Sequence, residues 1–82
     1  MYTTYILYSS KVNKFYTGQT ADMAKRLEEH NRGKTQFMAN GTPWKIIYAV
    51  ELSSRKEAMK LEKLIKKRGA ARFLKDLNLS FG

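Results

Sequence analysis

Glu62 is the residue whose position is hardest to explain by packing alone. At about 100° per residue, a helix brings positions 58, 61, 62, 65 and 69 into one arc. The other four are small or apolar: Ala58, Leu61, Ile65 and Gly69. An ionised carboxylate on such a face is costly unless it is paired or binds a metal. Glu62 is therefore a candidate metal ligand; the alternative is a glutamate at the stripe's edge, with its tip in water or paired with an arginine.

A second candidate group is the pair Arg26 and His30, which lie four residues apart and so share a helix face. His30 falls inside the arc set by Met23 and Leu27, and Arg26 lies at the border of that arc. Taken alone, the histidine is most simply a core residue and the arginine a snorkelling side chain. Together with an inward carboxylate on another helix, the pair instead predicts a site.

Tyrosines supply further groups that could handle protons. The chain has 5 tyrosines, 0 cysteines and 1 histidine. Each tyrosine alone is typical of a strand core. If Tyr5, Arg26, His30 and Glu62 converge, however, the site would hold one metal ligand, one fixed cation and proton-handling groups. Phosphodiester cleavage uses such parts: a divalent ion to polarise the phosphate, an arginine for transition-state charge, and a base for water.

The N-terminal segment must position the tyrosines. Residues 2–8 are rich in aromatic and β-branched types and apolar on both faces, which predicts a central strand. Polar turn residues follow, and residues 14–18 form a second short strand, so the two are expected to make an antiparallel hairpin. Gly18 is expected to let the backbone turn sharply out of that strand.

The middle of the chain predicts one helix and one strand. Thr20 is a suitable N-cap for a helix over 21–32, which Gly33 can end. Residues 35–42 are typical of a loop with room for one helical turn. Residues 44–52 alternate in the clearest strand pattern of the chain.

Two helices complete the predicted fold. Ser54 and Glu57 form a capping box that starts a helix ending at Gly69, and a short helix follows over about 70–78. The order is ββα-β-αα, which predicts an α/β fold with a small three-stranded, mostly antiparallel sheet flanked by helices. Without linkers, repeats or low-complexity tracts, residues 1–82 are expected to form a single domain.

Composition narrows the function classes. The lack of cysteine excludes disulfides, thiolate zinc sites and cysteine nucleophiles. No signal peptide and no membrane-spanning run is recognisable, so we expect a cytoplasmic protein without a membrane partner. The formal net charge of +9 favours nucleic acid as the partner. The alternatives are a basic soluble surface, acidic lipid and acidic protein.

The motifs, taken in order, resemble those of a GIY-YIG nuclease domain over essentially the whole chain. The first motif stands as Thr3-Thr4-Tyr5 and the second as Tyr16-Thr17-Gly18, followed by Arg26, His30 and Glu62 at the family's later positions. The pattern is most similar to small stand-alone members related to the nuclease domain of the excision-repair endonuclease. Three threonines replace the Gly and Ile of the first motif and the Ile of the second, around retained tyrosines.

The resemblance implies a divalent-metal-dependent endonuclease that hydrolyses DNA phosphodiester bonds, in DNA repair or recombination. It implies one Mg²⁺ or Mn²⁺ on Glu62, Arg26 on the scissile phosphate, and a motif tyrosine that helps to activate water. We expect Tyr5 to accept the proton and Tyr16 to position phosphate or water. His30 is expected to orient a tyrosine or shuttle a proton.

Affinity for DNA should come from basic side chains that flank the site along the two helices. Two other functions remain open: a nucleic-acid-binding module that keeps the nuclease fold with little or no turnover, and a structural or adaptor domain. The expected phosphate contacts are Lys25, Arg32, Lys34, Lys63, Lys66 and Lys67.

Overall fold

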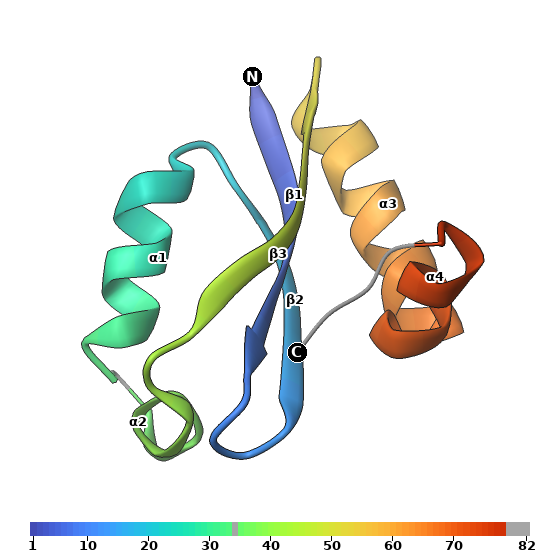
Figure 1. Ribbon diagram of the computed structural model, residues 1–82. Helices are drawn as coiled ribbons and strands as arrows, with labels where there is room; N and C mark the ends of the chain where they lie inside the picture. Colours follow the sequence, from blue (N-terminus) through green and yellow to red (C-terminus); the bar gives the residue numbers. More distant parts are fainter. Residues whose placement is uncertain (34, 79–82) are drawn as a thin grey trace.

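The computed structural model describes residues 1–33 and 35–78 (Figure 1). Its three strands and four helices alternate along the chain much as the sequence predicts. In chain order they are β1 (Tyr2–Ser9), β2 (Lys14–Thr20), α1 (Met23–Asn31), α2 (Gln36–Gly41), β3 (Lys45–Leu52), α3 (Arg55–Arg68) and α4 (Ala70–Asp76).

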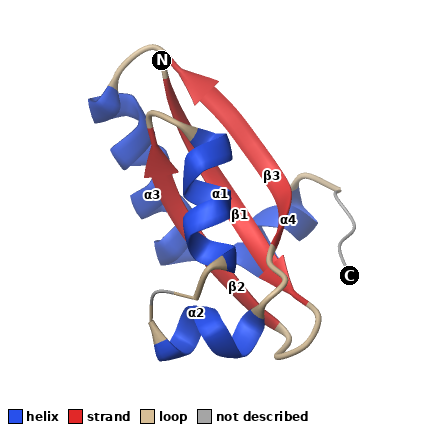
Figure 2. Ribbon diagram, turned by 90° about the vertical axis from the view of Figure 1, so that its left-hand side faces the viewer, coloured by secondary structure: helices blue, strands red, loops and turns tan. Residues whose placement is uncertain are grey.

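The strands form one antiparallel sheet in the order β2-β1-β3 (Figure 2). The predicted α/β fold with a small three-stranded sheet is confirmed, and β1 is its central strand. Register places Tyr5 opposite Gly18 of β2 on one side and Ala49 of β3 on the other. A register shift between Ile6 and Leu7 interrupts the pairing with β3.

Helices cover both faces of the sheet, with α1 and α2 on one face and α3 and α4 on the other (Figure 1). Successive side chains of a strand point to opposite faces, so β1 contributes to two cores. Tyr5 and Leu7 join the core beneath α1 and α2, whereas Ile6 joins the core beneath α3 and α4. The residues of β1 are therefore divided between two layers.

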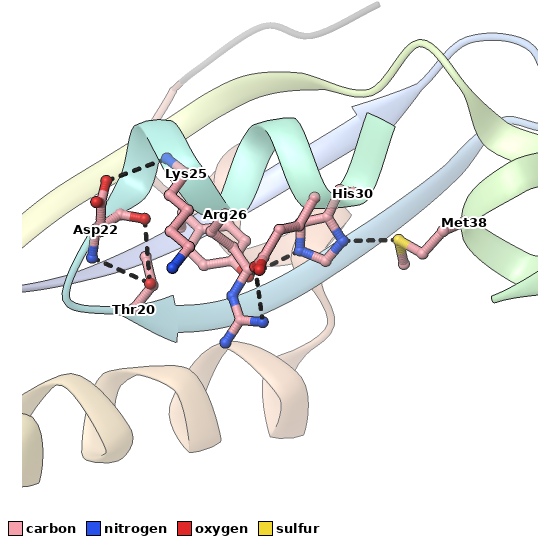
Figure 3. A network of polar contacts seen from close by, with 8 residues as sticks. Thr20, Asp22, Lys25, Arg26, His30 and Met38 are labelled. Carbon is pink, nitrogen blue, oxygen red and sulfur yellow. Dashed lines mark hydrogen bonds and ion pairs between the residues drawn. The ribbon is translucent and has the colours of Figure 1, made fainter. Parts of the chain in front are cut away.

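The first helix begins later than predicted, because Thr20 still belongs to β2. Asp22 is the N-cap of α1, and its Oδ1 accepts a hydrogen bond from the Lys25 amide at 3.1 Å (Figure 3). The Thr20 hydroxyl instead accepts from the Asp22 amide at 3.1 Å and shapes the turn into the helix. The N-cap prediction was therefore wrong by two residues.

Two other boundaries differ from the prediction. The expected loop over 35–42 contains the short helix α2, because the Thr35 hydroxyl caps it by accepting from the Met38 amide at 3.2 Å. Helix α4 ends at Asp76, and Asn78 has a positive φ of 59° that helical backbone does not allow. Within residues 1–33 and 35–78, no helix is both long and apolar enough to cross a membrane.

Asn31 clamps the end of α1 to the start of β3. Its Oδ1 accepts from the Trp44 amide at 2.6 Å, and its Nδ2 donates to the Trp44 carbonyl oxygen at 3.2 Å. The Trp44 indole Nε1 in turn donates to the Met38 carbonyl oxygen at 2.9 Å. A Cβ at Gly41 would lie 2.4 Å from the indole ring, so only glycine lets α2 pack this closely. The clamp thus orders α1, α2 and β3 together.

We expect Asn31→Ala to lower the free energy of unfolding by about 1–3 kcal/mol, because it leaves the amide and carbonyl of buried Trp44 without these partners. Urea unfolding followed by tryptophan fluorescence measures the loss. Asn40→Ala is the matched control, since the Asn40 side chain makes an exposed hydrogen bond to Gln36. Equal stability of the two variants would contradict a structural role for the clamp.

Candidate active site

A hydrogen bond between Tyr5 and His30 lies at the centre of the candidate site. The Tyr5 hydroxyl is 3.0 Å from His30 Nε2, and both side chains are buried, with 1% and 7% of each residue exposed. Tyr5 is supplied by the central strand and His30 by the last turn of α1. The sequence-based expectation that these two residues converge is met.

The partners of His30 define its tautomer. Its Nδ1 lies 2.7 Å from the Met38 Sδ, and a thioether sulfur can only accept a hydrogen bond. Nδ1 therefore carries the proton, and Nε2 of the neutral ring accepts from the Tyr5 hydroxyl. The imidazole connects the central strand to α2 through one polar chain, whose course from His30 to Met38 is visible in Figure 3.

Burial keeps both groups of this pair uncharged. It raises the pKa of Tyr5 well above its ordinary value of 10.0, with further increases from the neighbouring Tyr16 and the Glu62 charge and an opposing effect of Arg26. Burial also lowers the pKa of His30 below 6.5, as does the positive charge of Arg26, while Glu29 opposes the change. A neutral phenol thus donates to a neutral imidazole at neutral pH.

Gly18 makes room for the Tyr5 ring. A Cβ at this position would lie 2.6 Å from the Tyr5 hydroxyl oxygen and 2.9 Å from Cζ. Gly18 lies inside β2, opposite Tyr5, and the strand continues to Thr20. The prediction that Gly18 ends the strand with a sharp turn was therefore wrong: the glycine is needed for the close approach of a side chain.

Tyr16 and Arg26 face a pocket between β2, α1 and α2. The pocket has a volume of about 250 Å³ and is also bordered by His30. The Tyr16 ring lies 4.6 Å from the His30 ring, centroid to centroid, and stacks on Tyr5 at 6.4 Å. The Arg26 side chain is 45% exposed, and in Figure 3 its guanidinium extends away from α1, past β2, in the direction of α3. Arg26 Nη1 lies 3.7 Å from Glu29 Oε1.

Glu62 reaches the site from the other face of the sheet. Its side chain is 21% exposed, and Oε2 lies 2.7 Å from Lys66 Nζ. The carboxylate raises the pKa of Tyr5, so its charge acts across the sheet. The Thr4 hydroxyl donates to the Ala58 carbonyl oxygen at 2.8 Å and fixes α3 one turn before Glu62. The structure combines the two interpretations of Glu62: the residue is largely buried, and it is paired with a lysine rather than an arginine.

Edge strand β2 is where the two halves of the site meet. Tyr16 borders the pocket on the α1 side and also a hollow on the α3 side, which Thr17 and Lys66 help to line. Arg26 and Glu62 therefore flank one strand from opposite faces. This arrangement joins a cation, a carboxylate and a phenol at one exposed edge of the sheet.

The donor set at Glu62 fits a hard divalent cation with few protein ligands. Among residues 1–33 and 35–78, no three His, Asp or Glu side chains gather into a group that could hold a metal. Mg²⁺ commonly keeps several waters and uses one or two carboxylates together with substrate phosphates. A single Glu62 carboxylate suits that mode, provided that Lys66 releases it.

The predicted phosphate contacts fall into two groups. Lys25 borders a hollow beside Arg26, and Lys66 borders the one beside Tyr16, so both flank the site. Lys63 and Lys67 lie roughly 100–140° around α3 from Glu62 and are exposed on its outer side, so they do not flank the site as expected.

Arg32 and Lys34 complete the set of predicted contacts. Arg32 is held by an exposed ion pair with Glu28, which a phosphate could replace at little cost. Lys34 lies outside the described residues.

Sequence reasoning missed the contribution of α2. Met38 is the sulfur partner of His30, and Phe37 contacts Tyr16 and Trp44 with ring-centroid distances of 6.5 and 5.5 Å. The only signal was the cap residue Thr35 before two apolar residues, within a segment interpreted as a loop. Glu29, which faces the same pocket, gave no signal beyond a charge on an exposed helix.

We expect stability to fall as pH decreases below about 6.5, because the unfolded chain protonates His30 there and the folded chain does so only at lower pH. Above pH 6.5 the ring is neutral in both states, and the full stability is present. Urea unfolding between about pH 7.5 and 5.5 tests this. His30→Gln is the control, because the chain has no other histidine. A parent profile as flat as that of the variant would contradict the tautomer assignment.

Comparison with known proteins agrees with this architecture. A family model described as the GIY-YIG catalytic domain matches residues 1–76. No solved structure is significantly similar to the chain.

Three bacterial proteins illustrate the similarity. The UPF0213 protein of Streptococcus pneumoniae serotype 4 is 42% identical over 55 residues, which are 66% of this chain and 56% of that protein. UPF0213 protein YazA of Bacillus subtilis is 38% identical over 70% of this chain and 59% of its own length. UPF0213 protein YsiG of Lactococcus lactis is 34% identical over 93% of this chain and 78% of its own. The matched part thus spans less than two thirds of the first two relatives. Because the family model covers nearly all of the chain, the chain belongs to the GIY-YIG nuclease domain family.

Proposed function

We propose that this chain is a divalent-metal-dependent endonuclease that hydrolyses phosphodiester bonds in DNA. One observation supports the proposal most directly: Tyr16, Arg26 and Glu62 come from three separate elements and lie around the same edge strand. A phosphodiester that crosses this edge would meet a phenol, a guanidinium and a carboxylate. A role in DNA repair or recombination, suggested by the family resemblance, is part of the same proposal.

Arg26 is the group suited to the phosphate. Its separation of 3.7 Å from Glu29 is too long for a strong hydrogen bond, so the exposed guanidinium is available to a ligand. A guanidinium binds two phosphate oxygens with its planar fork, and the attraction grows as charge accumulates in the transition state. Arg26 therefore serves the reaction more than the binding of DNA.

The two tyrosines differ in what can reach them. Tyr5 is buried and its hydroxyl proton is donated to His30, whereas Tyr16 is half-buried in the wall of the pocket beside Arg26. Burial therefore favours the reverse of the roles expected from the sequence. Tyr16 orients the attacking water through its hydroxyl oxygen. Tyr5 and His30 are positioning residues that hold the Tyr16 ring by stacking and edge contacts.

Glu62 is the residue that would hold Mg²⁺ or Mn²⁺. When bound, such a cation supplies Lewis acidity and withdraws charge from a phosphate oxygen. Lys66 must first release the carboxylate, and its ammonium group is then free to contact a DNA phosphate. Lys25 offers a second phosphate contact on the α1 side. Because these contacts release counterions, affinity should decrease steeply with salt.

The Lys66–Glu62 ion pair also favours a second candidate, a nucleic-acid-binding module with little turnover. In that case Lys66 remains the permanent partner of the carboxylate, and no cation binds there. Both candidates bind DNA in a salt-dependent way. They differ in whether the charge of Glu62 is needed for strand cleavage.

We expect Glu62→Gln to reduce cleavage by roughly a hundredfold or more while DNA binding remains, because the amide keeps the shape of the side chain and loses its charge. The measurement is cleavage of linear and branched DNAs with Mn²⁺, together with affinity between about 50 and 200 mM salt. Glu57→Gln is the matched control, since Glu57 is an exposed residue of the same helix.

Three outcomes separate the candidates. Loss of cleavage in Glu62→Gln alone supports the nuclease. Full activity in Glu62→Gln, with chelator-resistant turnover in the parent, rules out the metal role. Salt-steep binding by a parent that cleaves none of the DNAs supports the binding module, and a flat salt response contradicts both.

We expect Tyr16→Phe to lose more single-turnover rate than Tyr5→Phe, because Tyr16 lines the pocket that holds Arg26 and the Tyr5 hydroxyl is enclosed with His30. Each change removes one oxygen atom and keeps the ring, so the two variants control for each other. DNA affinity should be retained in both. A larger loss in Tyr5→Phe would restore Tyr5 as the proton acceptor, and normal cleavage by both variants would return the tyrosines to a packing role.

A further inference from the structure

We propose that the pocket between α1 and α2 receives an unpaired nucleobase next to the scissile phosphate, and that Phe37 is the platform on which this base stacks. The inference rests on the proposed function, because it uses the DNA strand that Arg26 and Tyr16 would hold. It narrows the substrate class to DNA that presents an unpaired nucleotide at the cleavage point.

Phe37 is a large apolar side chain that the fold leaves exposed. It is 45% exposed, whereas Met38, the next residue of the same short helix, is 6% exposed. Three contacts hold α2 in place: the Thr35 cap, the His30–Met38 hydrogen bond, and the indole of Trp44 on the Met38 carbonyl. An aromatic ring on so well anchored a helix forms a preorganised surface, which lowers the cost of binding.

The pocket beside Phe37 has aromatic walls. Phe37 lies between two other rings, with centroid distances of 6.5 Å to Tyr16 and 5.5 Å to Trp44, both tilted. Tyr16 and Phe37 line the same pocket of about 250 Å³. Nucleobases stack on aromatic side chains without regard to sequence, because each base has a π-face.

Polar groups at the same pocket match the rest of a nucleotide. Arg26, the proposed phosphate contact, borders the pocket together with Glu29. A phosphate on Arg26 therefore brings the attached nucleotide to the pocket that Phe37 lines. The half-buried Glu29 carboxylate can accept a hydrogen bond from an exocyclic amino group of a base.

A base inside a regular duplex cannot enter this pocket, because its two faces are covered by its neighbours and its edge is paired. It must be unstacked first, which costs least in single strands, flaps and mismatches. Phe37 thus favours DNA in which the nucleotide beside the cleaved bond is already unpaired.

The test uses single-stranded DNA that carries one 2-aminopurine, whose fluorescence falls when it stacks on an aromatic ring. The protein carries Glu62→Gln, so that the DNA stays intact. We expect this protein to quench the probe, and Phe37→Ala and Phe37→Leu in the same background to lose the quenching. Phe37→Leu retains apolar packing on Trp44, so its loss reports the ring rather than folding. Phe37→Tyr should restore the quenching.

Affinity is measured in parallel for single-stranded DNA and for a duplex of the same sequence. We expect Phe37→Ala to weaken single-strand binding by about tenfold and to leave duplex binding unchanged. Leu64→Ala is the matched control, because Leu64 is an exposed apolar residue of α3, 55% exposed. Quenching that persists in Phe37→Leu, or equal weakening of both DNAs, would overturn the proposal.

The failure of this inference is distinguishable from that of the proposed function. If the parent cleaves DNA in a Glu62-dependent way but Phe37→Ala behaves like Leu64→Ala, only the base pocket is wrong. If Phe37→Ala loses single-strand binding while the parent cleaves nothing, the base pocket stands in a protein without nuclease activity.

Discussion

The hydrogen bond between Tyr5 and His30 is the contact on which the α1 side of the molecule depends. A buried polar pair is costly unless every group is satisfied, and here the Tyr5 hydroxyl, the imidazole and the Met38 sulfur satisfy one another. The chain of contacts draws α1 and α2 onto the same face of β1. Gly18 belongs to this constraint, because any side chain there would occupy the place of the Tyr5 hydroxyl.

The edge position of β2 lets residues from both faces of the sheet act together. A central strand would separate Arg26 from Glu62 by side chains of its neighbours, whereas an edge strand leaves a short path around it. Thr4 contributes to the arrangement from the central strand, since its hydroxyl fixes α3 by a hydrogen bond to Ala58. A threonine where the family motif has isoleucine thus has a structural role, which ties the first motif to the helix that carries Glu62.

Burial assigns different duties to chemically similar side chains. Tyr5 and Tyr16 lie on paired strands and their rings stack, yet one is enclosed by α1 and the other borders a pocket. The same contrast holds for Met38 and Phe37, adjacent residues of α2 with opposite exposure. In both pairs the buried member fixes the geometry, and the accessible member faces whatever enters the pocket.

The sequence by itself determined the order of elements, the central strand, and the residues Tyr5, Tyr16, Arg26, His30 and Glu62 as a set, because periodicity and motif spacing are local properties. It also indicated that Glu62 faces inward. Tertiary structure alone decided the Lys66 partner of Glu62, the space at Gly18 and the accessibility of each tyrosine. It also placed Met38 and Phe37 at the site through α2, whose six residues are too few to show a periodic pattern. Those features depend on which segments meet in space, and contacts between segments far apart in the chain leave no local signal in a single sequence.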